Sequence, residues 1–244
     1  MMGSTHFATG ALAGCGIFAA TGASPPLIIA GSVLTGGAAL VPDLDHTNSC
    51  PTLAVKPVTG WLATGLRELS ASVYRRSATD YERRSTNERD PGRHRYLTHT
   101  LVFAAALGGA AWWSSELFVV RVVLSVLLVA FAIRGAAQKI AVVRPLDKPV
   151  LRLAVSAALG CCLGWAIEPR QLALALAAGC VVHVLGDMMT KSGVPLLWPY
   201  MINGKRWWKV RTPGAITTGE GRVEPALRWA CLVGTPMVGI WFGL

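Results

Sequence analysis

The sequence contains few charged residues for its length. Only 15% of its 244 residues are Asp, Glu, Lys or Arg, while 52% are hydrophobic. This balance excludes an ordinary soluble domain, because such a domain carries more charge on its surface. The sequence also lacks a Walker loop, a dinucleotide-binding fingerprint and a G-x-S-x-G elbow. It therefore gives no sign of a nucleotide-driven enzyme or a serine hydrolase.

Cysteine and N-terminal charge are also scarce. The six cysteines show no C-x-x-C spacing, and five of them lie in apolar runs, where a free cysteine behaves as a small hydrophobe. No Lys or Arg occurs among the first seven residues. Because a secretory signal peptide begins with a basic segment, we do not expect a cleaved one here.

Long apolar runs dominate the rest of the chain. Several of them are slightly shorter than the roughly 20 residues that a spanning helix needs, so we expect seven membrane helices, with six as the alternative. The runs are Phe7–Ala23, Pro26–Val41, Thr98–Trp113, Leu117–Ile133, Val150–Ile167, Leu172–Thr190 and Ala226–Leu244. The sequence thus predicts an all-α, polytopic transmembrane helical bundle, with residues 1–244 as a single integral membrane domain. The first two runs are rich in glycine and alanine, which predicts close helix packing.

The basic residues are placed asymmetrically. If the N-terminus is cytoplasmic, the segments His46–Leu97, Arg134–Pro149 and Lys191–Pro225 lie on one side of the membrane. These segments and their flanks hold all 23 basic residues except Arg121 and Arg170. This is the pattern of the positive-inside rule. It predicts a multi-pass membrane protein with a cytoplasmic N-terminus, and it explains the net charge of +10 without a nucleic-acid partner.

Two of these cytoplasmic segments are long. In the insert 47–93, residues Gly60–Arg76 have the pattern of an amphipathic helix lying on the membrane surface, with a soluble cap as the alternative. We expect Ser77–Arg93 to be a mobile connector. The loop 191–225 interleaves tryptophans with cations, which is typical of interfacial anchoring. In a second interpretation, its cations hold a lipid headgroup or a substrate phosphate; they are Lys205, Arg206, Lys209 and Arg211.

All five histidines fall near one end of the expected bundle. His183 and Asp187 share a helix face, because they are four residues apart in an apolar run. Pro42 disfavours helix before it, so Asp43 and Asp45 are expected to project together from an extended segment. His94 is expected in a loop, and His99 in the first helical turn with Thr98 as its N-cap.

These positions suggest a metal centre at the cytoplasmic interface. An isolated carboxylate in a membrane span is costly and is usually paired or functional. Imidazole and carboxylate ligands suit zinc, with manganese or iron as alternatives, and their number allows one or two ions. The candidate metal ligands are His6, Asp43, Asp45, His46, His94, His99, His183 and Asp187.

Three motifs carry a resemblance to a known family. They are Pro-Asp-Leu-Asp-His at 42–46, His-Arg-Tyr-Leu-Thr-His at 94–99, and the run from His-Val-Leu-Gly-Asp to Leu-Leu-Trp-Pro at 183–199. Together with His6, they resemble the signatures of a bacterial inner-membrane family of metal-dependent hydrolases, whose implied ligands are the eight residues above. A fainter similarity links the site to zinc-dependent phospholipases C and related nucleases. The charged insert and Tyr96 depart from the family pattern.

The leading interpretation is a membrane-bound, metal-dependent hydrolase. Its expected substrate is a phosphoester of a phospholipid or another amphiphile, and its expected nucleophile is a metal-activated water. Asp43 or Asp45 is the candidate general base, and Arg95 is the candidate group that holds the substrate anion. The alternative is a metal-binding membrane protein without catalytic activity that transports ions, senses them or regulates a partner.

Overall fold

The computed structural model describes residues 1–86 and 91–242. The helices are α1 (Gly3–Ala20), α2 (Pro25–Ala38), α3 (Val58–Ser77), α4 (Asp80–Ser85), α5 (Leu101–Ser114), α6 (Phe118–Ala137), α7 (Pro149–Ala166), α8 (Pro169–Met188) and α9 (Val223–Trp241). Three short 3₁₀ helices join them, namely η1 (Val41–Asp45), η2 (Leu97–His99) and η3 (Ala141–Asp147). Within the described residues, the only β-type pairings are isolated bridges. The predicted all-α class is therefore confirmed.

Each of the seven apolar runs overlaps one helix, in the order α1, α2, α5, α6, α7, α8 and α9. Proline is the first residue of α2, α7 and α8, where its fixed φ suits a helix and its missing N–H costs nothing. Among the described residues, four helical stretches are long and apolar enough to cross a membrane: Pro25–Asp45, α6, α7 and α8. Helix α5 is apolar but shorter. The count of seven crossings thus stays a prediction, and residues 243–244 of the last run lie outside the described part.

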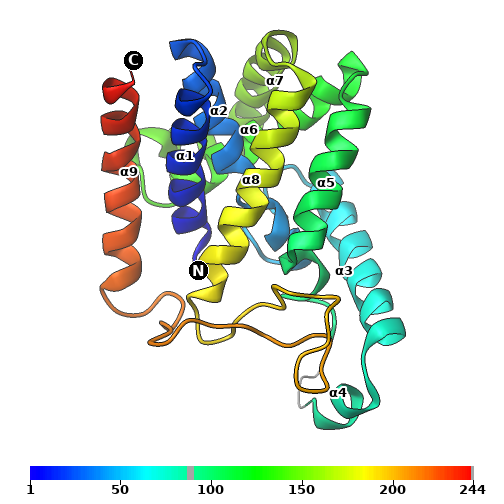
Figure 1. Ribbon diagram of the computed structural model, residues 1–244. Helices are drawn as coiled ribbons and strands as arrows, with labels where there is room; N and C mark the ends of the chain where they lie inside the picture. The colour runs from blue at the N-terminus through cyan, green and yellow to red at the C-terminus, as the bar shows by residue number, and fades with distance from the viewer. Residues whose placement is uncertain (87–90, 243–244) are drawn as a thin grey trace.

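The seven helices alternate in direction along the chain and pack into one bundle (Figure 1). Helix α2 packs against α1, α6 and α8, and α1 also contacts α9. Glycine allows the close approach that the sequence predicted: a Cβ on Gly14 of α1 would lie 2.5 Å from the carbonyl oxygen of Gly31 in α2, and one on Gly37 would lie 2.0 Å from that of Leu128 in α6. Because backbone atoms occupy these positions, small residues are required there.

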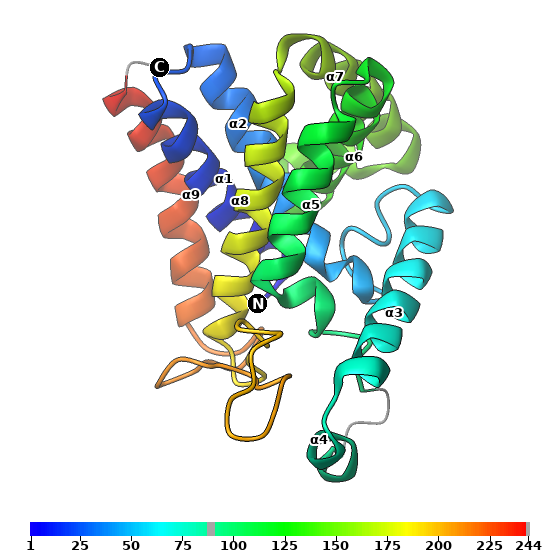
Figure 2. The same cartoon turned by 45° about the vertical axis from the view of Figure 1, so that its right-hand side comes forward.

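The expected amphipathic helix is α3, and it leaves Trp61, Leu62 and Leu69 exposed. It does not lie across the end of the bundle. Instead it descends steeply beside the lower half of α5 (Figures 1 and 2). The side chains it exposes therefore run along the flank of the bundle.

The segment after α3 differs from the expected mobile connector. Residues 80–85 form α4, which begins with a reciprocal capping box between Thr79 and Glu82. Two satisfied backbone N–H groups stabilise this short helix, although the segment has few apolar residues. Residues 87–90, which include part of the predicted connector, lie outside the described structure.

The insert also contacts the loop that follows α8. The Trp207 backbone N–H donates to Glu82 Oε1 at 2.7 Å, and the Trp207 indole N–H donates to Ser77 Oγ at 3.1 Å. Trp207 is only 4% exposed and packs with Tyr74, Tyr96 and Trp198. The prediction that the tryptophans of this loop anchor it in the headgroup layer is therefore wrong for Trp207, which is buried and joins the loop to the insert.

Candidate metal centre

The last two turns of α8 place His183 and Asp187 on one buried face, as the four-residue spacing predicted. Gly186 lies between them in sequence. A Cβ at Gly186 would lie 2.3 Å from the Met1 side chain and 3.3 Å from the ring of His6. The glycine therefore gives the start of α1 room to reach the end of α8.

His183 is held in one orientation by the backbone of the turn after α2. Its Nδ1 donates a hydrogen bond to the carbonyl oxygen of Ala39 at 2.7 Å. With the proton on Nδ1, the lone pair of a neutral ring is on Nε2. This is the arrangement typical of a metal-ligating histidine, whose other nitrogen is bound to a carbonyl or carboxylate group.

His99 presents its Nε2 in the same way. Thr98 Oγ1 donates to Asp45 Oδ2 at 2.5 Å, so it accepts a hydrogen bond from His99 Nδ1 at 2.9 Å. The structure therefore corrects the expected role of Thr98. The N-cap of α5 is Thr100, whose hydroxyl accepts from the Phe103 N–H, and His99 lies before the helix, in η2.

The two free Nε2 atoms face each other at the centre of the site. They lie 3.1 Å apart, and two opposed lone pairs repel each other unless a cation lies between them. Carboxylate oxygens surround the pair: Asp187 Oδ2 is 3.4 Å from His99 Nε2 and 3.7 Å from His183 Nε2. Asp43 Oδ1 is 3.9 Å and 3.7 Å from the same two atoms.

These distances fit a metal ion. Ligand atoms about 2.0 to 2.1 Å from a tetrahedral zinc ion lie about 3.3 Å from one another. In addition, His6 Nδ1 is buried without a hydrogen-bond partner, which is costly in a protein interior. His99, His183, Asp43 and Asp187 are therefore the best-placed candidate ligands.

Among the described residues, Asp43 is common to two of the three groupings that could hold an ion. Its neighbours are His6 and His183 in one and His94 and His99 in the other, with each set of donor atoms within 4.8 Å. The expected extended segment is wrong here, because residues 41–45 form the 3₁₀ helix η1 with Pro42 in its first turn. Proline is compatible with the first turn of a helix, where its N–H is not needed. Asp43 and Asp45 nevertheless both face the site.

Asp45 orients the neighbouring histidines. Its Oδ1 accepts from His94 Nδ1 at 2.6 Å, and its Oδ2 accepts from the Arg95 backbone N–H at 3.1 Å and from the Thr98 hydroxyl. Although burial opposes protonation of His94, the hydrogen bond and the charge of Asp45 raise the pKa of His94. Asp45 is therefore placed to support ligands and not to act as one.

His6 reaches the site from the first turn of α1. Its ring stacks on His183 with a centroid distance of 3.7 Å, and its Nε2 lies 3.2 Å from Asp187 Oδ1. The backbone nitrogen of Met1 contacts the same oxygen. His6 thus lies beside the central group and could complete it.

The structure does not place the candidate ligand His46 with the donor atoms of the site. His46 is exposed and belongs to none of the groupings found among the described residues. Its Nδ1 accepts from the Asn48 backbone N–H at 3.3 Å. Burial and the neighbouring His94 lower the pKa of His46.

Arg95 links the loop before α5 to the end of α8. Its Nη2 lies 3.0 Å from Asp187 Oδ2, and its Nη1 donates to Thr190 Oγ1 at 2.8 Å. Thr190 in turn donates to the Asp187 carbonyl oxygen at 2.7 Å. The guanidinium therefore balances the charge of the buried Asp187.

The four basic residues of the loop 191–225 that were predicted to hold a headgroup or a substrate phosphate do not all lie together. Lys205, Lys209 and Arg211 line a pocket of about 450 Å³ beside the site. Arg206 is not among the lining residues and contacts the Ser77 carbonyl oxygen at 3.3 Å.

Sequence reasoning missed the groups that support the ligands. Thr98 could have been found, because it lies inside the His-Arg-Tyr-Leu-Thr-His motif. For Thr190, the sequence offered only a weak indication, namely that it follows Asp187 by three residues and can hydrogen-bond to its carbonyl oxygen. The Ala39 carbonyl could not be identified, since a backbone acceptor has no sequence signature.

The fold and this site define a polytopic helical membrane protein with a candidate metal centre at one end of its bundle. Residues 1–240 match the family model described as YdjM inner membrane protein. The chain therefore belongs to the YdjM inner membrane protein family, which confirms the predicted inner-membrane character. No curated protein and no solved structure matched the chain significantly.

Proposed function

We propose that this chain is a metal-dependent hydrolase that acts at the cytoplasmic membrane interface on a phosphoester of a lipid or another amphiphile. The observation that carries the proposal is the group of four donor atoms on His99, His183, Asp43 and Asp187, with His99 Nε2 and His183 Nε2 only 3.1 Å apart. A bound divalent cation would supply activation of water and polarisation of a phosphoryl oxygen.

Access to the site supports catalysis. His6, Asp45, His99, His183 and Asp187 are buried, but the Asp43 side chain is 17% exposed and the His94 side chain 37%. A substrate can therefore approach along Asp43 and His94. Asp43 is the better candidate for the general base, since both oxygens of Asp45 already accept hydrogen bonds. In that role Asp43 stays off the metal, and His99, His183 and Asp187 remain as ligands with one coordination position open to water.

Arg95 keeps its proposed role as the group that holds the substrate anion. Its present contacts with Asp187 and Thr190 involve one N–H-bearing nitrogen each, and a guanidinium has five N–H donors. Each terminal nitrogen carries a second N–H, so Arg95 can bind a phosphoryl oxygen while it still contacts α8. In this proposal zinc is the metal, as one or two ions, and manganese or iron are the alternatives.

The experiment is an assay of the purified full chain in lipid nanodiscs. Metal content is measured first, and release of phosphate or headgroup is then followed with phosphatidic acid and phosphatidylglycerol as substrates. We expect turnover that disappears with a chelator, returns with zinc and is absent in His183→Ala. Stoichiometric metal without turnover on either substrate would refute the hydrolase.

The second candidate is a metal-binding protein without catalytic activity that transports ions, senses them or regulates a partner. It is favoured by the contacts of Asp187, whose two oxygens already face His6, His99 and Arg95. A site fully coordinated by protein has no open position for water. In this case Asp187→Ala loses the bound metal, but no hydrolysis is measured before or after the change.

A further inference from the structure

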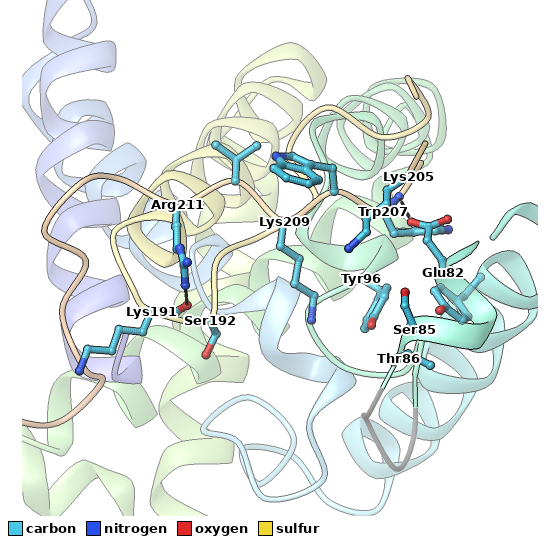
Figure 3. Close-up of a pocket in the computed structure, with 13 residues that line it drawn as sticks. Glu82, Ser85, Thr86, Tyr96, Lys191, Ser192, Lys205, Trp207, Lys209 and Arg211 are labelled. Carbon is cyan, nitrogen blue, oxygen red and sulfur yellow. Dashed lines mark hydrogen bonds between the residues drawn. The ribbon is translucent and has the colours of Figure 1, made fainter. Parts of the chain in front are cut away.

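A pocket lies between the insert and the loop after α8. Its volume is about 450 Å³, which lies in the range of small-molecule sites and exceeds what a single inorganic anion fills. Figure 3 shows residues of α4 on one side and residues of the 191–211 loop on the other. The pocket thus joins two segments that are more than a hundred residues apart.

Positive charge dominates the wall of this pocket. The cationic lining residues are Lys191, Lys205, Lys209 and Arg211, and the one acidic lining residue in the described part of the chain is Glu82. Glu82 is buried and already accepts hydrogen bonds from the Thr79 and Trp207 backbone N–H groups. Its charge is therefore directed into the protein, and the pocket favours an anion.

Aromatic rings also line the pocket. Tyr96 and Trp207 are buried beside the pocket, while Trp208 is 37% exposed. The Lys209 ammonium lies 4.4 Å from the centre of the Tyr96 ring, and in Figure 3 it points into the space between Tyr96 and Ser192. Ring faces next to cations bind an anion that carries an organic group better than a bare ion.

Two segments of the backbone connect the pocket to the candidate metal centre. Tyr96 follows Arg95, and Lys191 follows Thr190, while the side chains of Arg95 and Thr190 are joined by a 2.8 Å hydrogen bond. A ligand in the pocket therefore lies one residue away from groups that contact Asp187.

We propose that this pocket binds the phosphate group of an organic phosphate ester, with Lys209 and Arg211 as its principal cations. Charge-assisted contacts from lysine and arginine are the common means of phosphate recognition. The ester is either the headgroup of a membrane lipid or a water-soluble phosphate. Binding here does not require that the protein hydrolyses its ligand, so the inference can be tested apart from the proposed activity.

The test measures binding of two probes to the full chain. Binding of a water-soluble phosphate is measured by equilibrium dialysis of radiolabelled glycerol phosphate against the chain in phosphatidylcholine nanodiscs. Binding of a lipid headgroup is measured by lipid mass spectrometry, as the enrichment of phosphatidic acid with the detergent-purified chain. We expect the double variant Lys209→Gln with Arg211→Gln to lower binding of one probe by about a hundredfold, because each of the two lost charge-assisted contacts weakens binding by about tenfold. The probe whose binding is lowered shows whether the phosphate belongs to a lipid or to a water-soluble ester.

Three controls keep the result interpretable. Arg144→Gln removes an exposed charge on η3, away from the pocket, and should leave binding unchanged, while Lys209→Arg should retain it. His183→Ala should lose metal but keep the phosphate ligand. The inference is overturned if wild type binds neither probe, if Arg144→Gln weakens binding as much as the double variant, or if His183→Ala abolishes it.

Discussion

At the scale of single residues, the candidate centre depends on how its histidines are oriented. His183 directs Nδ1 to the Ala39 carbonyl, and His99 directs Nδ1 to Thr98. Both rings therefore turn Nε2 toward the same point, between Asp43 and Asp187. A histidine that lacks this geometry, such as His46, should contribute little to metal binding.

The first prediction compares these two histidines. His183→Ala should remove bound metal from the purified protein, because a central ligand is lost. His46→Ala should retain it, since His46 lies outside the groupings that could hold an ion. Elemental analysis of both variants by mass spectrometry measures the difference. Equal metal loss in the two variants would contradict the central position assigned to His183.

The second prediction concerns Asp45, which orients His94 and, through Thr98, His99. Asp45→Asn removes the charge that holds both rings, and loss of such a supporting carboxylate typically weakens metal affinity by about 10- to 100-fold. Competition with a zinc-sensitive dye gives the affinity. A variant that binds metal as tightly as wild type would show that the orientation by Asp45 is dispensable.

At the scale of helices, the contact between α1 and α2 positions His6 relative to the end of α8. This contact depends on glycines that permit backbone approach, as at Gly14 and Gly31. Gly16, one half-turn further along α1, has open space around it. Alanine substitutions at Gly14 and Gly16 therefore separate the effect of helix packing on stability from the effect of helix propensity.

The third prediction compares Gly14→Ala with Gly16→Ala. A Cβ at position 14 would lie 2.5 Å from the Gly31 carbonyl oxygen, and such overpacking typically destabilises by about 1 to 3 kcal/mol. At position 16 the same substitution should be neutral or stabilise by up to about 1 kcal/mol, since alanine is the better helix former. Thermal unfolding of both variants in the same detergent measures the order. Equal melting temperatures would argue against tight packing at Gly14.

At the scale of the whole molecule, the loop 191–225 and the candidate metal centre lie at one end of the bundle, and the turn between α5 and α6 lies at the other (Figure 1). Arg121 and Arg170, the two basic residues outside the charge pattern, belong to the first turns of α6 and α8. They therefore lie at the end opposite to the centre, as the topology predicted from charge requires.

The fourth prediction tests this topology. Single cysteines replace the exposed residues Ser85, Ser192 and Glu116 in a protein whose exposed Cys161 and Cys162 are alanine. A membrane-impermeant maleimide should label position 116 in intact spheroplasts. Positions 85 and 192 should react only after permeabilisation, because the positive-inside rule places them in the cytoplasm. The reverse labelling would invert the orientation.

The sequence by itself determined the helical class, the seven apolar segments and the residue types of the centre. These follow from local properties: apolar length, small residues in α1 and α2, and the four-residue spacing of His183 and Asp187. It also indicated the end of the bundle at which the histidines gather, because loop charge and helix order are both read along the chain.

Only the tertiary structure decided which candidates meet. His99 and His183 are 84 residues apart, and no local pattern specifies that their Nε2 atoms oppose each other. The separation of Asp45 from the central donors, the exclusion of His46 and the burial of Trp207 against Glu82 likewise depend on contacts between distant segments. Such contacts arise from packing of the whole chain, which spacing along the sequence does not encode.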